Sequence, residues 1–147
     1  MENLYSRLLD LLGKRYTDPI FPQFIADIGE QPDDCNWSDP VLFNKFDTPL
    51  VFYKSGHFSL RFRYGVAHHI VASINTPMIR SGEVRPFEGL PAGIVASDSR
   101  SEIEAKLKTK PFSSTEGRYD AYYIEPYVLT FNFENERLFF FEIEFRP

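Results

Sequence analysis

The side chains best suited to chemistry in this sequence are its three histidines, His57, His68 and His69. Imidazole binds metal ions and transfers protons near neutral pH, so a metal or acid–base site has to be considered. All three lie on segments predicted to form one hairpin. Adjacent residues of a regular strand point to opposite faces, which predicts that His68 and His69 cannot bind one ion. We therefore expect a structural or solvent-exposed role for them, with no metal and no cofactor.

Two acids near the C-terminus, Glu142 and Glu144, are expected to share one face of the last strand. Paired carboxylates catalyse proton transfer when a pocket raises the pKa of one of them. Neighbouring acids in the sequence instead favour a solvated acidic face. The hydroxyl run 113–115 has no base near it and is predicted to be a loop. Phosphate-binding and metalloprotease motifs are also missing from the sequence, so we expect no catalytic residues and no enzyme activity.

Alternating apolar residues predict strands with one buried face. The side chains expected to point away from the core are those of Ser59, Arg61, Arg63, His69, Val71, Ser73, Val128, Thr130, Asn132, Leu138, Phe140, Glu142 and Glu144. Such a mixture of apolar, arginine and acidic side chains is typical of a protein-binding surface. We predict that a partner contacts Arg61, Arg63, Phe140, Glu142 and Glu144. The open alternative is that the connection 76–96 folds over this face.

An acidic loop provides a second candidate binding region. Five acids and no basic residue lie between Asp27 and Asp39, and the predicted contact residues are Asp33, Asp34, Trp37 and Asp39. The loop is an insertion in one half of the chain, which favours a function, although tolerance of long loops explains it equally well. Trp37 either anchors a partner or fills the local core, and the second role is favoured.

A repeated pattern specifies the elements that position these residues. The segment 58–64 aligns without a gap on the segment 127–133, sixty-nine positions later, and the hairpins that follow align at the same offset. Two units that cannot bury their own apolar faces are expected to merge into one sheet. The predicted boundaries within this single domain are 1–75 for the first unit, 76–96 for the connection and 97–147 for the second.

Periodicity and capping residues predict the individual elements. Helices are expected at 2–15, at 18–28 before Gly29, and from a capping box of Ser99 and Glu102 to a stop at Pro111. Strands are expected at about 50–54, 57–64, 68–75, 119–124, 127–134 and 137–145, with a tight turn at Asn135. In sequence order these elements predict an α+β fold, with one antiparallel sheet of about six strands and the helices packed on one face.

Composition narrows the function further. The chain has 147 residues, a net charge of −5, one cysteine, 15 phenylalanines and 8 tyrosines. The negative charge argues against a general nucleic-acid binder, and a lone cysteine excludes an internal disulfide. No membrane-length apolar run and no signal-peptide pattern is present, so we expect no membrane contact and a cytoplasmic location.

Several motifs resemble those of small bacterial immunity proteins encoded beside polymorphic toxins. The motifs are Phe87-Glu-Gly-Leu-Pro-Ala-Gly93, Asp98-Ser-Arg-Ser-Glu102, Leu107 to Pro111 and Arg118-Tyr-Asp-Ala-Tyr122, and the segment from Leu11 to Pro32 looks like the same family's opening module. The tandem layout is also similar to that of β-lactamase inhibitory protein, which binds its target on an exposed sheet face. The resemblance implies a stoichiometric antitoxin whose partner is a toxin domain, for example a basic nuclease. The alternative is a structural module that forms a homodimer through the same face.

Overall fold

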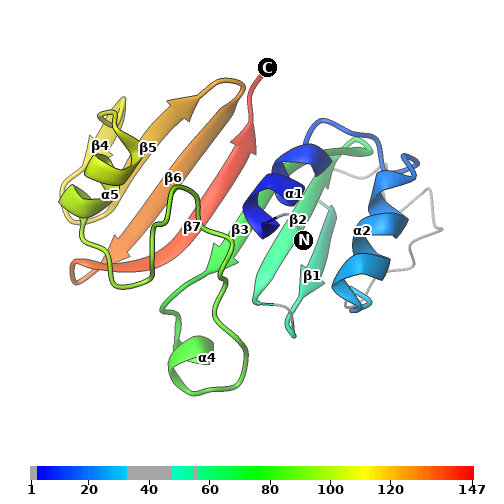
Figure 1. Ribbon diagram of the computed structural model, residues 1–147, viewed down its shortest axis with the longest axis horizontal. Helices are drawn as coiled ribbons and strands as arrows, with labels where there is room; N and C mark the ends of the chain where they lie inside the picture. The colour runs from blue at the N-terminus through cyan, green and yellow to red at the C-terminus, as the bar shows by residue number, and fades with distance from the viewer. Residues whose placement is uncertain (1–2, 33–47, 55) are drawn as a thin grey trace.

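One antiparallel sheet of seven strands forms the framework of the protein (Figure 1). The strand order is β1-β2-β3-β7-β6-β5-β4, symmetrical about the central pair β3 and β7 except for the added edge strand β4. The computed structural model describes residues 3–32, 48–54 and 56–147. The strands are β1 (Thr48–Phe52), β2 (Phe58–Arg63), β3 (Val66–Ser73), β4 (Ser113–Thr115), β5 (Tyr119–Ile124), β6 (Tyr127–Glu134) and β7 (Arg137–Phe145). The predicted α+β class with one antiparallel sheet is confirmed.

The helices begin and end where local side chains or turns satisfy the free backbone groups. In the described residues they are α1 (Leu4–Leu11), α2 (Ile20–Ile28), α4 (Pro77–Arg80) and α5 (Arg100–Leu107). The side chain of Asn3 accepts a hydrogen bond from the amide of Ser6 at 2.9 Å and caps α1. The predicted stop at Gly29 and the predicted capping box of Ser99 and Glu102 are both present. None of these helices is long and apolar enough to cross a membrane.

Helices α1, α2 and α5 and the part of the connection that holds Phe87 and Ile94 pack on the same face of the sheet, which we call the inner face (Figure 1). Residues from α1, α2 and α5 share one buried cluster with the inward residues of the strands. The ring of Phe87, in the connection, lies 5.7 Å from the ring of Phe58 and 6.4 Å from that of Phe141. Because Phe87 and Ile94 are buried in this cluster, the connection covers the inner face. The alternative that the connection folds over the opposite, outer face is therefore wrong.

Two β-bulges change which side chains face outward. In the pairing of β6 with β7, Asn132 lies opposite Phe140 and Phe133 lies opposite Leu138, so Phe139 is the extra residue. Leu138 consequently points into the core and is fully buried. The prediction that Leu138 faces outward is wrong, because an extra residue resets the alternation of the strand.

Strand β4 is the one strand that the sequence did not predict. It pairs with β5, and the amide of Phe112 extends the pairing by donating to the carbonyl of Ala121 at 2.9 Å. The hydroxyl run expected to be a loop is therefore an edge strand of the sheet. The expected tight turn between β6 and β7 is confirmed, with φ values of 51° at Asn135 and 62° at Glu136.

Candidate protein-binding face

The outer face of the sheet carries the predicted contact residues that the structure describes. Arg61 lies opposite His69 in the pairing of β2 with β3, and Phe140 lies opposite Asn132 in the pairing of β6 with β7. Glu142 and Glu144 alternate with the buried residue between them, which confirms that the two acids share one face. Arg63 ends β2 and is exposed.

The predicted residues of the acidic loop cannot be placed on this face or elsewhere. Asp33, Asp34, Trp37 and Asp39 lie outside the described residues. Their role in partner binding stays a prediction.

Glu142 is the centre of a hydrogen-bonded network across three central strands. Its Oε1 atom lies 3.1 Å from Nε2 of His69 on β3. Its Oε2 atom accepts a hydrogen bond from the side-chain amide (Nδ2) of Asn132 on β6 at 2.8 Å. An ionised carboxylate can only accept hydrogen bonds, so His69 is the donor through Nε2. The network fixes the carboxylate in one orientation on the outer face.

Glu144 forms a second charged cluster next to the first. Its carboxylate accepts hydrogen bonds from Nε of Arg146 at 3.0 Å and from Nη2 of Arg146 at 3.3 Å. Nε2 of His68 lies 3.9 Å from Oε1 of Glu144. Both His68 and His69 therefore reach the outer face, contrary to the sequence prediction. The cause is the bulge between β2 and β3, in which His68 is the extra residue.

Both carboxylates are held in the ionised form. Burial acts to raise the pKa of Glu142, but hydrogen bonds from His69 and Asn132 outweigh it, so that the pKa lies below its ordinary value. Burial likewise acts to raise the pKa of Glu144, and the hydrogen bond and charge of Arg146 reverse the effect. Neither acid has the raised pKa of a general acid at neutral pH. The pair is suited to electrostatic recognition and not to proton transfer.

A concavity of about 430 Å³ lies beside these carboxylates. Its lining comes from β4, β5, β6 and β7, with Glu142 and Glu144 on one side. Ala121 and Val128 line it as nearly buried apolar side chains. Phe112, which also lines it, is 58% exposed. The concavity thus combines an apolar surface, an exposed aromatic ring and fixed negative charge.

Tyrosine side chains continue this surface along β5. Tyr123 is 51% exposed. Tyr123 lies opposite Val128, and Tyr119 lies opposite Asn132, so both tyrosines share the outer face with residues predicted to be there. The sequence predicted which residues of β6 point outward. Applying the same alternation of faces to β5 would have identified these tyrosines. Phe112 could not be found in this way, because the segment after it was predicted to be a loop.

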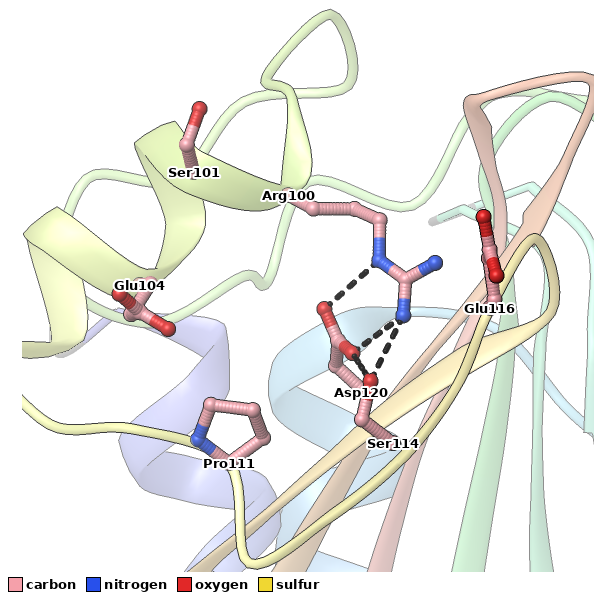
Figure 2. A pocket seen from close by; sticks show the side chains of 7 residues that line it. All are labelled: Arg100, Ser101, Glu104, Pro111, Ser114, Glu116 and Asp120. Carbon is pink, nitrogen blue, oxygen red and sulfur yellow. Dashed lines mark hydrogen bonds and ion pairs between the residues drawn. The ribbon is translucent and has the colours of Figure 1, made fainter.

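A second hollow, of about 420 Å³, lies between α5 and the β4–β5 hairpin (Figure 2). Nε of Arg100 donates to Oδ2 of Asp120 at 2.9 Å, and Nη2 of Arg100 donates to Oγ of Ser114 at 2.9 Å. Ser114 in turn donates to the same carboxylate. Arg100 and Asp120 are therefore engaged in joining the helix to the hairpin, so we assign this pair a structural role.

The remaining histidine is also in a structural position. Nδ1 of His57 lies 2.6 Å from Oγ of Ser73, and the imidazole ring stacks on Tyr53 at 5.1 Å between centroids. Burial lowers the pKa of His57, which favours a neutral ring. In the part of the chain that the structure describes, no group of three or more His, Cys, Asp or Glu residues could hold a metal ion.

Comparison with known proteins identifies a distant structural likeness. No protein-family model and no curated protein sequence matches the chain. The structure is similar to the crystal structure of YjgB, a DUF4309 family protein from Bacillus subtilis. The alignment covers 98% of this chain and 94% of that chain, with 10% sequence identity and a TM-score of 0.48.

Proposed function

We propose that this chain is an immunity protein, a non-catalytic antitoxin that neutralises a bacterial toxin domain by binding it in a one-to-one complex. The contact surface is the outer face of the sheet. The observation that carries the proposal is the concavity over β4–β7, which exposed Phe112 lines together with the fixed carboxylates of Glu142 and Glu144. Aromatic residues are enriched at interface centres, where a few of them supply most of the binding energy.

The physical roles of these groups in binding differ. Burial of Phe112 and Tyr123 against a partner supplies affinity, because both rings are more than half exposed in the free chain. The carboxylates orient the partner and exclude surfaces of like charge. A net charge of −5 speeds the encounter with a basic partner, which fits a nuclease toxin acting in the cytoplasm.

Purified proteins provide the direct test. The toxin domain encoded beside this chain should form a one-to-one complex with it in calorimetry and should lose its toxicity when the two are coexpressed. Phe112→Ala and Tyr123→Ala should weaken the complex. Val95→Ala is the matched control, because Val95 is 50% exposed but lies in the connection that packs on the inner face.

Two results would contradict the proposal. One is a complex whose affinity is the same for all three variants, since the outer face would then play no part. The other is a stable homodimer in sedimentation experiments that buries Phe112 and Tyr123 and binds no toxin. That outcome would favour the alternative, a structural module that self-associates through the same face.

A further inference from the structure

We infer that the concavity over β4–β7 receives one basic side chain of the partner, an arginine or a lysine. This inference rests on the proposed function and adds the chemistry of the contact. The aliphatic part of the side chain would lie on Ala121 and Val128, and its charge would lie at Glu142 and Glu144. The four residues line the same hollow.

Charge in the concavity favours a cation. Three charged side chains line it, the carboxylates of Glu142 and Glu144 and the guanidinium of Arg146. The sum of these three charges is one negative charge, which a single cation neutralises. Glu142 is 25% exposed and Glu144 is 30% exposed, so a partner that covers them has to replace lost water contacts. A basic side chain does so with charge-assisted hydrogen bonds.

Arg146 shows that this face already binds a guanidinium group. Its Nε and Nη2 atoms both donate to the carboxylate of Glu144, while its side chain remains 56% exposed. Two-point contact of this kind is specific to a guanidinium and a carboxylate. Because Arg146 lines the concavity and is more than half exposed, an incoming cation can replace it at Glu144 or bind next to it at Glu142. Arg146 therefore competes with the partner's basic residue.

The apolar part of the lining favours a long side chain over a small cation. Ala121 and Val128 are 5% and 4% exposed, and they present only methyl groups to the hollow. Arginine and lysine bury their methylene groups on such surfaces while the charged end stays near polar groups. Thr130 and Asn132 also line the hollow and supply further acceptors.

The test uses n-butylguanidinium as the probe and n-butylurea as its neutral counterpart of nearly the same shape. Titrations of the full chain are followed by NMR. Butylguanidinium should cause saturable shifts at the Ala121 and Val128 methyl groups and at the Asn132 amide, and butylurea should bind more weakly. Glu142→Gln and Glu144→Gln should each reduce affinity by about two- to fivefold, the usual range for a partly exposed ion pair.

The most discriminating variant is Arg146→Gln. Removing the competing guanidinium should increase the affinity for butylguanidinium by about two- to fivefold. This factor corresponds to the strength of the partly exposed ion pair between Arg146 and Glu144 that the probe no longer has to displace. Arg137→Gln removes the same charge from an exposed position at the start of β7 and should leave affinity unchanged. Equal binding of both probes, no shift at the concavity, or equal effects of Arg146→Gln and Arg137→Gln would overturn the inference.

The outcome separates the inference from the proposed function. If the toxin complex depends on Phe112 and Tyr123 but the concavity does not bind butylguanidinium, the immunity function stands and the basic-residue contact is wrong. If butylguanidinium binds as expected and no toxin complex forms, the site is real and the proposed function is wrong.

Discussion

The guanidinium of Arg100 and the carboxylate of Asp120 meet side by side (Figure 2), with Nε 2.9 Å from Oδ2 and Nη2 bonded to Oδ1. The pair joins the first residue of α5 to strand β5. Within α5, Ile103 is the one fully buried side chain. Arg100 also lies over the ring of Phe133 at 5.2 Å, which adds a cation–π contact. Attachment of this helix to the sheet therefore depends strongly on one ion pair.

Asp120→Asn should lower the free energy of unfolding by about 1.5–3 kcal/mol at pH 7, the range for hydrogen bonds to charged groups. Burial acts to raise the pKa of Asp120, but hydrogen bonds from Arg100 and Ser114 and the charge of Arg100 lower it below its ordinary value. Because the pKa is lower in the folded state, the ionised carboxylate stabilises the protein at pH values above its unfolded-state pKa of about 4. This stabilisation is lost as the pH falls through the folded-state pKa. Urea denaturation between pH 7 and pH 3 should show that the difference in unfolding free energy between the wild type and Asp120→Asn decreases as the pH falls.

Asp27→Asn is the matched control for this experiment. Asp27 also bonds an arginine, Arg7 at 2.7 Å, but its side chain is 36% exposed, whereas that of Asp120 is 8% exposed. The control should destabilise the protein less, because water and salt screen an exposed pair. If the two variants lose equal stability, or if the Asp120→Asn deficit does not change with pH, the ion pair does not hold α5 as we describe.

Tyr122→Phe should increase stability by about 1 kcal/mol. The Tyr122 side chain is fully buried, and its hydroxyl has no hydrogen-bond partner among the described residues. Burial raises the pKa of Tyr122 to about 12, with Asp120 and Glu104 adding to the effect. Removing a buried polar group without a partner recovers the free energy lost on dehydrating it. Thermal unfolding of the variant measures the change.

Tyr127→Phe provides the opposite case, because the Tyr127 hydroxyl donates to the carbonyl of Leu9 at 3.2 Å. Its removal should cost about 1 kcal/mol. A loss of stability in Tyr122→Phe, comparable with that of Tyr127→Phe, would mean that the Tyr122 hydroxyl does have a partner.

Gly13→Ala should destabilise the protein more than Gly29→Ala. Both glycines have positive φ, 85° and 76°, so alanine at either position costs about 1–2 kcal/mol in backbone strain. A Cβ atom at Gly13 would also lie 2.9 Å from the ring of Phe145, whereas nothing lies within 4 Å at Gly29. The difference between the two unfolding free energies isolates the contact with Phe145. Equal losses would show that the ring moves aside without cost.

Sequence patterns predicted the strands and their inward faces better than the details of the outer face. Side chains alternate between the two faces of a strand with a period of two residues, so the sequence correctly predicted Glu142 and Glu144 on one face. The alternation failed at His68 and Leu138, because a bulge adds one residue on one strand and leaves no clear mark in the sequence. The edge strand β4 was missed because its three residues are too few for a periodic signal.

The candidate site was predictable only where it lies on regular strands. The predicted acids are on the outer face, but the concavity also needs Phe112, Tyr119 and Ala121 from β4, β5 and their junctions. The pairings of β4 with β5, β5 with β6 and β6 with β7 together bring these residues to the hollow that Glu142 lines.

Binding of a toxin domain should depend on exposed rings and on the orientation of Glu142. Phe112→Ala and Tyr123→Ala should each weaken the complex by about 2 kcal/mol or more, the usual minimum for a residue at an interface centre. Asn132→Ala should weaken it by a smaller amount, because it removes the 2.8 Å hydrogen bond that fixes Oε2 of Glu142 without removing the charge. Calorimetry against the purified toxin domain measures all three changes.

The salt dependence of these variants distinguishes the role of the carboxylates from that of the rings. Raising ionic strength should weaken the wild-type complex, since screening reduces the attraction between the carboxylates and a basic partner. The Glu142→Gln complex should respond less to salt, while the Phe112→Ala complex should keep the wild-type response at lower affinity. If Glu142→Gln and wild type respond equally, Glu142 contributes no charge to recognition. The contact would then depend on the apolar part of the face alone.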